Sequence, residues 1–211
     1  MPANTRLRER VLARFVGTQP GGDPFSHLRT LLTPEQMAAA RRHLPTELRH
    51  AAVLVPLIDR PEGLTVLLTL RASHLKHHAG QISFPGGRTE AHDASPLETA
   101  LRETEEEIGL AREFVSHVGY LNDHAVVTGF RITPAVALVR PGFTLTLDRT
   151  EVEEVFEMPL EFILDPQHHV PRDRDFKGVT VITYEIPFEG RHIWGATAQM
   201  LVNLARLLAE P

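Results

Sequence analysis

The sequence contains no cysteine. This excludes disulfide bonds, thiol nucleophiles and thiolate metal sites, and it fits a reducing compartment. A basic excess is also lacking, because the formal net charge at pH 7 is −5, which argues against a general nucleic-acid binder. No run approaches the ~18 apolar residues of a membrane span. Charged residues also interrupt the N-terminal stretch where a signal peptide needs its apolar core. We therefore expect a cytoplasmic protein with no nucleic-acid partner and no membrane partner.

The composition is that of an ordinary globular protein. Of the 211 residues, 42% are hydrophobic and 23% are charged, which predicts one domain over residues 1–211. Helices are expected at residues 5–16 and 34–43, the second opened by a capping box with proline at its first position. Residues 1–45 are thus predicted to form a helical N-terminal extension packed on the domain. The sequence does not specify an oligomeric state.

From His50 onward, short runs rich in aliphatic and β-branched residues alternate with helical patterns. Strands are expected at residues 51–58, 63–70, 114–121, 130–139 and 179–188, the first two forming a hairpin. Helices are expected at residues 96–108, from Pro159, and from about 195 to 208. Strands interleaved with helices predict an α/β fold in which a mixed sheet is sandwiched between helices.

The helix at residues 96–108 contains a dense cluster of carboxylates in the sequence LRETEEEIGL. Glu103, Glu106 and Glu107 are spaced i, i+3 and i+4, so they share one face of the helix, whereas Glu105 points elsewhere. Arg102 alone cannot neutralise this cluster. A divalent cation can, because Mg²⁺ prefers hard carboxylate ligands. The alternative is a solvated acidic helix face, which the helix by itself does not exclude.

This stretch resembles the Nudix box. Gly87 and the segment from Arg102 to Leu110 follow its pattern of a glycine, a spaced acid and then R-E-U-x-E-E-x-G-U, where U is a bulky apolar residue. Thr104 stands where a bulky aliphatic residue is usual. The loop before Arg102 is one residue longer than the pattern, so Asp93 is not assigned a metal role.

A second motif lies directly before the box. LLTLRASHLKHHAGQISFPGG, residues 67–87, resembles the signature of the coenzyme A pyrophosphatase branch of the Nudix family. Lys76 stands where that signature has arginine, which keeps the positive charge but loses the planar fork. The two motifs adjoin each other, and together they cover residues 67–110.

The resemblance implies a Nudix-type fold and a hydrolase that depends on Mg²⁺ or Mn²⁺. The substrate would be coenzyme A or its derivatives, and the products 3′,5′-adenosine diphosphate and 4′-phosphopantetheine. Glu103, Glu106 and Glu107 are expected as catalytic metal ligands, and Arg102 as the residue that positions them. Metal ions suit this chemistry because they screen the diphosphate charge and lower the pKa of bound water.

The same resemblance implies which residues contact the substrate. Arg71 and Lys76 are expected to bind phosphates, and Gly86 and Gly87 to form a tight turn that lets backbone approach a ligand. A strip formed by His77, His78 and Arg88 could extend the basic region, although a surface position is the simpler interpretation of either histidine. Four aromatic residues could stack on adenine or belong to the core: Phe130, Phe143, Tyr184 and Trp194.

One carboxylate should accept the proton from the attacking water. The loop expected at residues 151–159 offers Glu151, Glu153 and Glu154, which could equally be surface charge. Two other functions stay open at this point. One is a Nudix enzyme for NADH, ADP-ribose or a nucleoside triphosphate. The other is a non-catalytic Nudix domain that senses a nucleotide, which the intact glutamate set disfavours.

Overall fold

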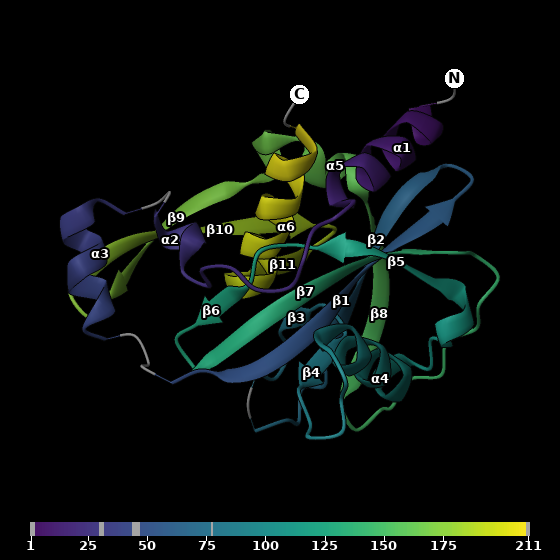
Figure 1. Ribbon diagram of the computed structural model, residues 1–211, viewed down its shortest axis with the longest axis horizontal. Coiled ribbons are helices and arrows are strands. Elements are labelled where there is room, and N and C mark those ends of the chain that lie inside the picture. Colours follow the sequence, from purple (N-terminus) through teal and green to yellow (C-terminus); the bar gives the residue numbers. More distant parts are fainter. Residues whose placement is uncertain (1–2, 30–31, 44–46, 77, 210–211) are drawn as a thin grey trace.

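A mixed sheet of eight strands forms the centre of the molecule (Figure 1). The computed structural model describes residues 3–29, 32–43, 47–76 and 78–209. The strands of this sheet are β1 (Arg49–Arg60), β2 (Gly63–Arg71), β3 (Ile82–Ser83), β4 (Gly86–Arg88), β5 (Val115–Tyr120), β6 (His124–Val126), β7 (Phe130–Val139) and β8 (Val152–Pro159). The main path runs β3-β2-β1-β7-β5, with β4 paired to β1, β6 to β7 and β8 to β2. The long central strands β1 and β7 are parallel.

Helices cover both faces of the large sheet, as the sequence predicts. The helices are α1 (Ala3–Phe15), α2 (Ser26–Arg29), α3 (Pro34–Arg41), α4 (Pro96–Ile108), α5 (Leu160–Leu164) and α6 (Gly195–Ala209), with 3₁₀ turns η1 (Arg112–Phe114) and η2 (Pro166–His168). On β1, Leu54 joins the buried cluster under α4, whereas Val55 and Leu57 join the cluster under α1 and α6. Alternation along one strand therefore supports two separate cores. Within the described part of the chain, no helix is long and apolar enough to cross a membrane.

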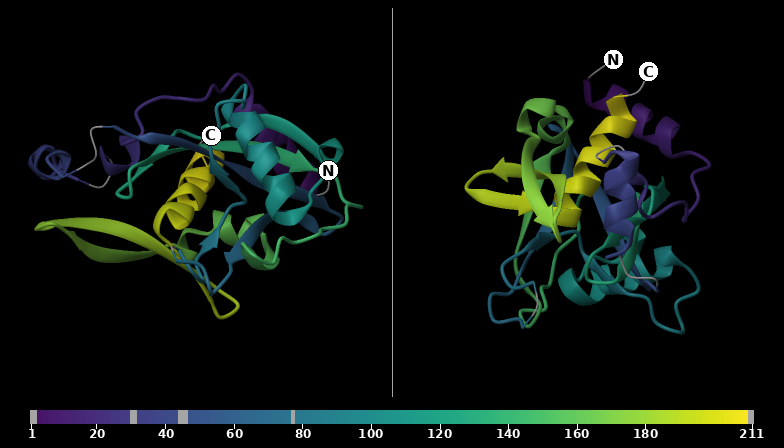
Figure 2. Two further views of the ribbon diagram at one scale, coloured as in Figure 1. Left: turned by 90° about the horizontal axis from the view of Figure 1, so that it is seen from below. Right: turned by 90° about the vertical axis from the view of Figure 1, so that its left-hand side faces the viewer.

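A second, three-stranded sheet follows in the chain. It is an antiparallel meander of β9 (Val170–Phe176), β10 (Val179–Phe188) and β11 (Arg191–Trp194). Figure 2 shows α6 between the large sheet and the long β9–β10 ribbon. The sequence predicted only β10. Strand β9 escaped notice because its sequence, VPRDRDF, has no buried face: most of its residues are exposed.

The segment at residues 151–159, expected to be a loop, is a strand instead. Its residues from Val152 to Pro159 form β8, which pairs antiparallel with β2. Val152 and Met158 are buried, so the segment has an apolar side, but its glutamates hide that pattern in the sequence. The helix expected from Pro159 is a single short element, α5.

Helix ends follow the capping signals in the sequence. In the box before α3, Thr33 Oγ1 accepts a hydrogen bond from Gln36 N–H at 3.2 Å, and Gln36 Oε1 accepts one from Thr33 N–H at 2.9 Å. Ser95 Oγ accepts from Glu98 N–H at the start of α4. Gly109 ends α4 with φ of 70°, a left-handed conformation that glycine adopts without strain. The two ends of α4 are therefore fixed by local capping contacts.

Helix α1 contributes to the main core. Leu7, Val11 and Phe15 belong to the buried cluster that also contains residues of α5 and α6. Val16, the residue that directly follows α1, is exposed.

We expect Phe15→Ala to lower the free energy of unfolding by ~3–5 kcal/mol, because it empties a fully buried aromatic site. Urea denaturation would measure this. Val16→Ala is the matched control and should change stability by less than ~0.5 kcal/mol. Equal, small effects for both variants would show that α1 does not contribute to the core.

Candidate active site

Gly86 and Gly87, predicted to form a tight turn, are instead the first two residues of strand β4, against which the glutamate helix α4 packs. Gly86 and Gly87 pair with Val53 and Ala52 of β1, and α4 packs on β4 and β1. A Cβ at Gly87 would lie 2.5 Å from the carboxylate of Glu103, and Gly86 has φ of +150° with its missing Cβ directed at the β1 backbone. Gly86 is therefore restricted to glycine by the β1 backbone, and a side chain at Gly87 would displace the Glu103 carboxylate from its present position.

Gly86 also holds one of the box carboxylates. Its backbone N–H donates to Glu107 Oε2 at 3.0 Å, and the Glu107 residue is only 4% exposed. Arg71 Nη1 lies 3.4 Å from Glu107 Oε1, which is a long and weak contact. Burial raises the pKa of Glu107 to about 7. The Gly86 hydrogen bond and Arg71 oppose that rise, and Glu151 and Glu103 add to it.

Arg102 is the centre of a network that joins three carboxylates. Its Nε and Nη2 atoms donate to the two oxygens of Asp93, each at 3.0 Å. Its Nη1 donates to Glu103 Oε1 and Glu106 Oε2, also at 3.0 Å each. The fifth contact runs from Nη2 to the carbonyl of Arg88 at 3.1 Å. Arg102 thus connects Arg88 and Asp93, which lie before the helix, with the glutamates of α4.

The additional loop residue does not remove Asp93 from the site. The side chain of Asp93 is 3% exposed and forms a two-pronged ion pair with Arg102. The hydrogen bonds from Arg102 lower the pKa of Asp93, and the bond to Asp93 raises the pKa of Arg102. Both groups stay charged near neutral pH. Both carboxylate oxygens of Asp93 face the arginine.

The donor chemistry of α4 suits a divalent cation. Within the described ranges, no group of three or more His, Cys, Asp or Glu side chains already converges as a metal cage. Arg102, however, takes one oxygen each of Glu103 and Glu106 in the bonds above, so the second oxygen of each remains for another partner. Burial also raises the pKa of Glu103, against the effect of Arg102. Carboxylates that are costly to ionise where they stand are those that a hard cation stabilises.

Of the three glutamates around β8, Glu151 is the one that reaches the site. Its Oε2 atom lies 3.9 Å from Arg71 Nη2, and its charge raises the pKa values of Glu103 and Glu107. Glu153 instead accepts a hydrogen bond from the Ser73 backbone at 3.1 Å. Glu154 pairs with Arg191.

The predicted substrate residues lie in different surroundings. Arg71 stands between Glu107 and Glu151 and lines a large cavity together with Gly86, Gly87 and Arg88. Lys76 is exposed and is not among the described residues that line this cavity. His78 lines it and bonds Gln81 at 2.8 Å, whereas the prediction for His77 lies outside the described residues.

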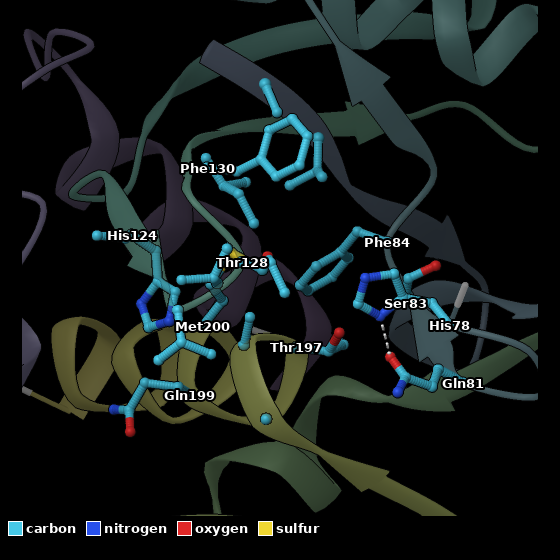
Figure 3. A pocket seen from close by; sticks show the side chains of 18 of the residues that line it. His78, Gln81, Ser83, Phe84, His124, Thr128, Phe130, Thr197, Gln199 and Met200 are labelled. Carbon is cyan, nitrogen blue, oxygen red and sulfur yellow. Dashed lines mark hydrogen bonds between the residues drawn. The ribbon is translucent and has the colours of Figure 1, made fainter. Parts of the chain in front are cut away.

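The cavity itself, of about 670 Å³, was not predicted from the sequence. Figure 3 shows Phe84 and Gln81 on one side of it, Phe130 on another, and Met200 with Thr197 on α6. Its walls come from β1, β6, β7, β10 and α6, far apart in the chain, so no short motif could reveal it. Phe130 and Trp194 line it. Phe143 packs near Phe114 instead, and Tyr184 packs against the main core.

A family model described as the NUDIX domain matches residues 48–177, more than half of the chain. The chain belongs to the Nudix family. An uncharacterized Nudix hydrolase named NudL from Yersinia enterocolitica is 41% identical over 157 residues, covering 74% of this chain and 80% of that protein. NudL of Salmonella dublin is 40% identical over 184 residues, covering 87% and 92%. Among solved structures, a Nudix hydrolase from M. smegmatis, RenU, matches 54% of this chain and 71% of its own with a TM-score of 0.46 and 24% identity.

Membership of the Nudix family confirms the resemblance seen in the box. The chain is a Nudix hydrolase that acts on a nucleoside diphosphate derivative, and Nudix hydrolases generally need a divalent metal ion. The carboxylates of Glu103, Glu106 and Glu107 on α4 are groups that could hold such an ion.

We expect Glu107 to destabilise the metal-free Nudix domain as the pH rises. Its pKa is raised from 4.5 to about 7 in the folded state. The stability linked to its protonated form is therefore present below the unfolded pKa and is lost as the pH rises through the folded value. The full effect is roughly 3 kcal/mol. In a chelator, Glu107→Gln should unfold at higher denaturant concentration than the wild type at pH 8, with the gap closing toward pH 4.5.

The matched control for this measurement is Glu105→Gln, an exposed position on the same helix. Its stability relative to wild type should not change with pH in this way. A Glu107→Gln difference that is constant across the pH range would contradict the assignment of a raised pKa.

Proposed function

We propose that this Nudix hydrolase cleaves the diphosphate of coenzyme A, with Mg²⁺ or Mn²⁺, to 3′,5′-adenosine diphosphate and 4′-phosphopantetheine. The supporting observation is the meeting of two motifs in space. Residues 67–87, which resemble the coenzyme A pyrophosphatase signature, contact the catalytic helix through Gly86 N–H and Arg71, both at Glu107. The same two residues line the large cavity. In this proposal the substrate signature and the glutamates of α4 belong to one site.

In the proposed reaction, one P–O bond of the diphosphate bridge breaks and the oxygen of water bonds to that phosphorus. The bridging oxygen leaves with the other phosphate, and the water proton passes to a base. A divalent ion held by Glu103, Glu106 and Glu107 would screen the substrate charge and make water a stronger nucleophile. Arg102 keeps the helix carboxylates in place through its contacts with Asp93, Glu103 and Glu106.

Arg71 is available for the substrate. Its contacts with Glu107 and Glu151 are long, at 3.4 and 3.9 Å. Its buried Nε atom has no hydrogen-bond partner among the described groups. A guanidinium in this state can bind a phosphate through its planar fork and gain the bonds it lacks.

Glu151 is our choice for the base. It is an exposed carboxylate that faces Arg71 and lies within the electrostatic reach of Glu103 and Glu107. The backbone carbonyl of Glu151 accepts a hydrogen bond from Ala72 N–H at 2.8 Å. This bond anchors the residue to the end of the signature strand β2.

We expect Glu151→Gln to lower kcat by ~10²–10⁴-fold, because general-base catalysis contributes that much, with little change in the melting temperature. Glu153→Gln is the matched control: it lies two residues away, but its carboxylate binds the Ser73 backbone. Steady-state kinetics would compare them. Similar kcat values for both variants would remove Glu151 from the mechanism.

The function is tested by incubating purified protein with coenzyme A and Mg²⁺ or Mn²⁺, beside NADH and ADP-ribose, and separating the products by chromatography. We expect 3′,5′-adenosine diphosphate from coenzyme A. Its formation should stop on chelation and fall by orders of magnitude in Glu107→Gln. Cleavage of NADH or ADP-ribose alone would keep the Nudix chemistry and replace the substrate. Binding of coenzyme A without turnover at saturating metal would indicate a nucleotide sensor.

A further inference from the structure

The large cavity extends well beyond the catalytic carboxylates, and its chemistry indicates what part of a substrate it accepts. We propose that it holds the acyl chain of an acylated coenzyme A thioester, so that acyl-coenzyme A is preferred to free coenzyme A. This inference rests on the proposed function and names the substrate class more narrowly. The volume of about 670 Å³ lies inside the ~300–1,000 Å³ range of small-molecule sites.

Charge decides which arm of the substrate enters. Among the described lining residues, only Arg71 and Arg88 carry a fixed charge. Arg88 follows Gly87 directly, and Arg71 shares the contact with Glu107 that Gly86 makes. The 3′,5′-adenosine diphosphate arm carries several negative charges, and burying these in an apolar cavity without cations is costly. The pantetheine arm is uncharged. The cavity therefore suits the pantetheine arm, and the diphosphate would lie beside Gly86 and Gly87.

Polar side chains lie in the segment just before Gly86 and Gly87, where the amides of the pantetheine arm would pass. His78, Gln81 and Ser83 lie together on one side of the cavity (Figure 3). Two polar side chains on α6 are already bonded within the protein. Thr197 Oγ1 donates to the Ile82 carbonyl at 3.0 Å, and Gln199 Nε2 donates to Asn203 at 3.1 Å. These groups make no demand on a ligand, so an apolar chain can lie against α6.

The remaining walls are apolar and continue into an exposed apolar rim. Phe130 and Met200 line the interior (Figure 3). At the surface, Val127, Ile182 and Trp194 are 62%, 37% and 44% exposed and line the same cavity. Large apolar side chains left in water around a cavity mark a binding surface for an apolar ligand. In the proposed complex an acyl chain extends beyond the thiol end of the arm and covers these side chains, whereas free coenzyme A has no such chain.

The test is a series of substrates that share the same nucleotide: coenzyme A and its acetyl, butanoyl, hexanoyl and octanoyl thioesters. The initial rate of 3′,5′-adenosine diphosphate release gives kcat/KM for each. Each buried CH₂ should raise kcat/KM by up to roughly fourfold, until the cavity is full. If coenzyme A is cleaved but kcat/KM does not rise with chain length, the inference is overturned while the proposed function stands. If no member is cleaved, both fall.

Two variants locate the effect. Ile182→Asn makes the rim polar, and it should reduce the ratio of octanoyl to free coenzyme A kcat/KM by several-fold. Val16→Asn is the matched control, because Val16 is an exposed apolar residue that does not line the cavity, and it should keep the wild-type ratio. A rise with chain length that Ile182→Asn leaves intact would place the acyl chain elsewhere and overturn the assignment of this cavity.

Discussion

The hydrogen bond from Gly86 N–H to Glu107 is the contact on which the site depends. It joins the end of residues 67–87 to the glutamate helix α4 at a buried position. Glycines allow this close packing, because a Cβ at Gly86 would meet the backbone of β1 and a Cβ at Gly87 would meet the Glu103 carboxylate. It also places a carboxylate where its charge is expensive, which is a cost that folding alone would not favour. A cation bound at this site, as proposed above, would offset that cost.

Arg102 explains how the fold tolerates the other carboxylates. One guanidinium contacts Asp93, Glu103 and Glu106, so a single positive charge faces three negative ones. The excess charge is therefore negative, and it lies close to Arg71, which lines the cavity. Asp93 and Arg102 neutralise each other and together support the helix. The glutamates keep the excess charge that binding of a cation would use.

The sequence predicted those parts of the molecule whose cause is local. The box helix could be placed because Ser95, Pro96 and Gly109 fix its ends, and its apolar stripe faces β1. The strand β8 was missed because glutamates interrupt its alternation, and its pairing with β2 is a contact between distant segments.

The cavity could not be predicted for the same reason. Phe130, Ile182 and Met200 meet only in the folded chain. The partners of Asp93 and Glu151 likewise depend on how the loops return to α4 and β2, which spacing along the chain does not encode.

The division of labour along the chain has an evolutionary consequence. The matched family region ends at residue 177, whereas Ile182, Trp194 and Met200 come from β10, β11 and α6 beyond it. The glutamates of α4 and the glycines of β4 lie inside the family region, and this part of the cavity wall lies outside. Substitutions at Ile182, Trp194 or Met200 therefore alter the cavity wall without replacing a carboxylate of α4. Evolution can change the shape of this cavity by sequence changes that leave the family motif untouched.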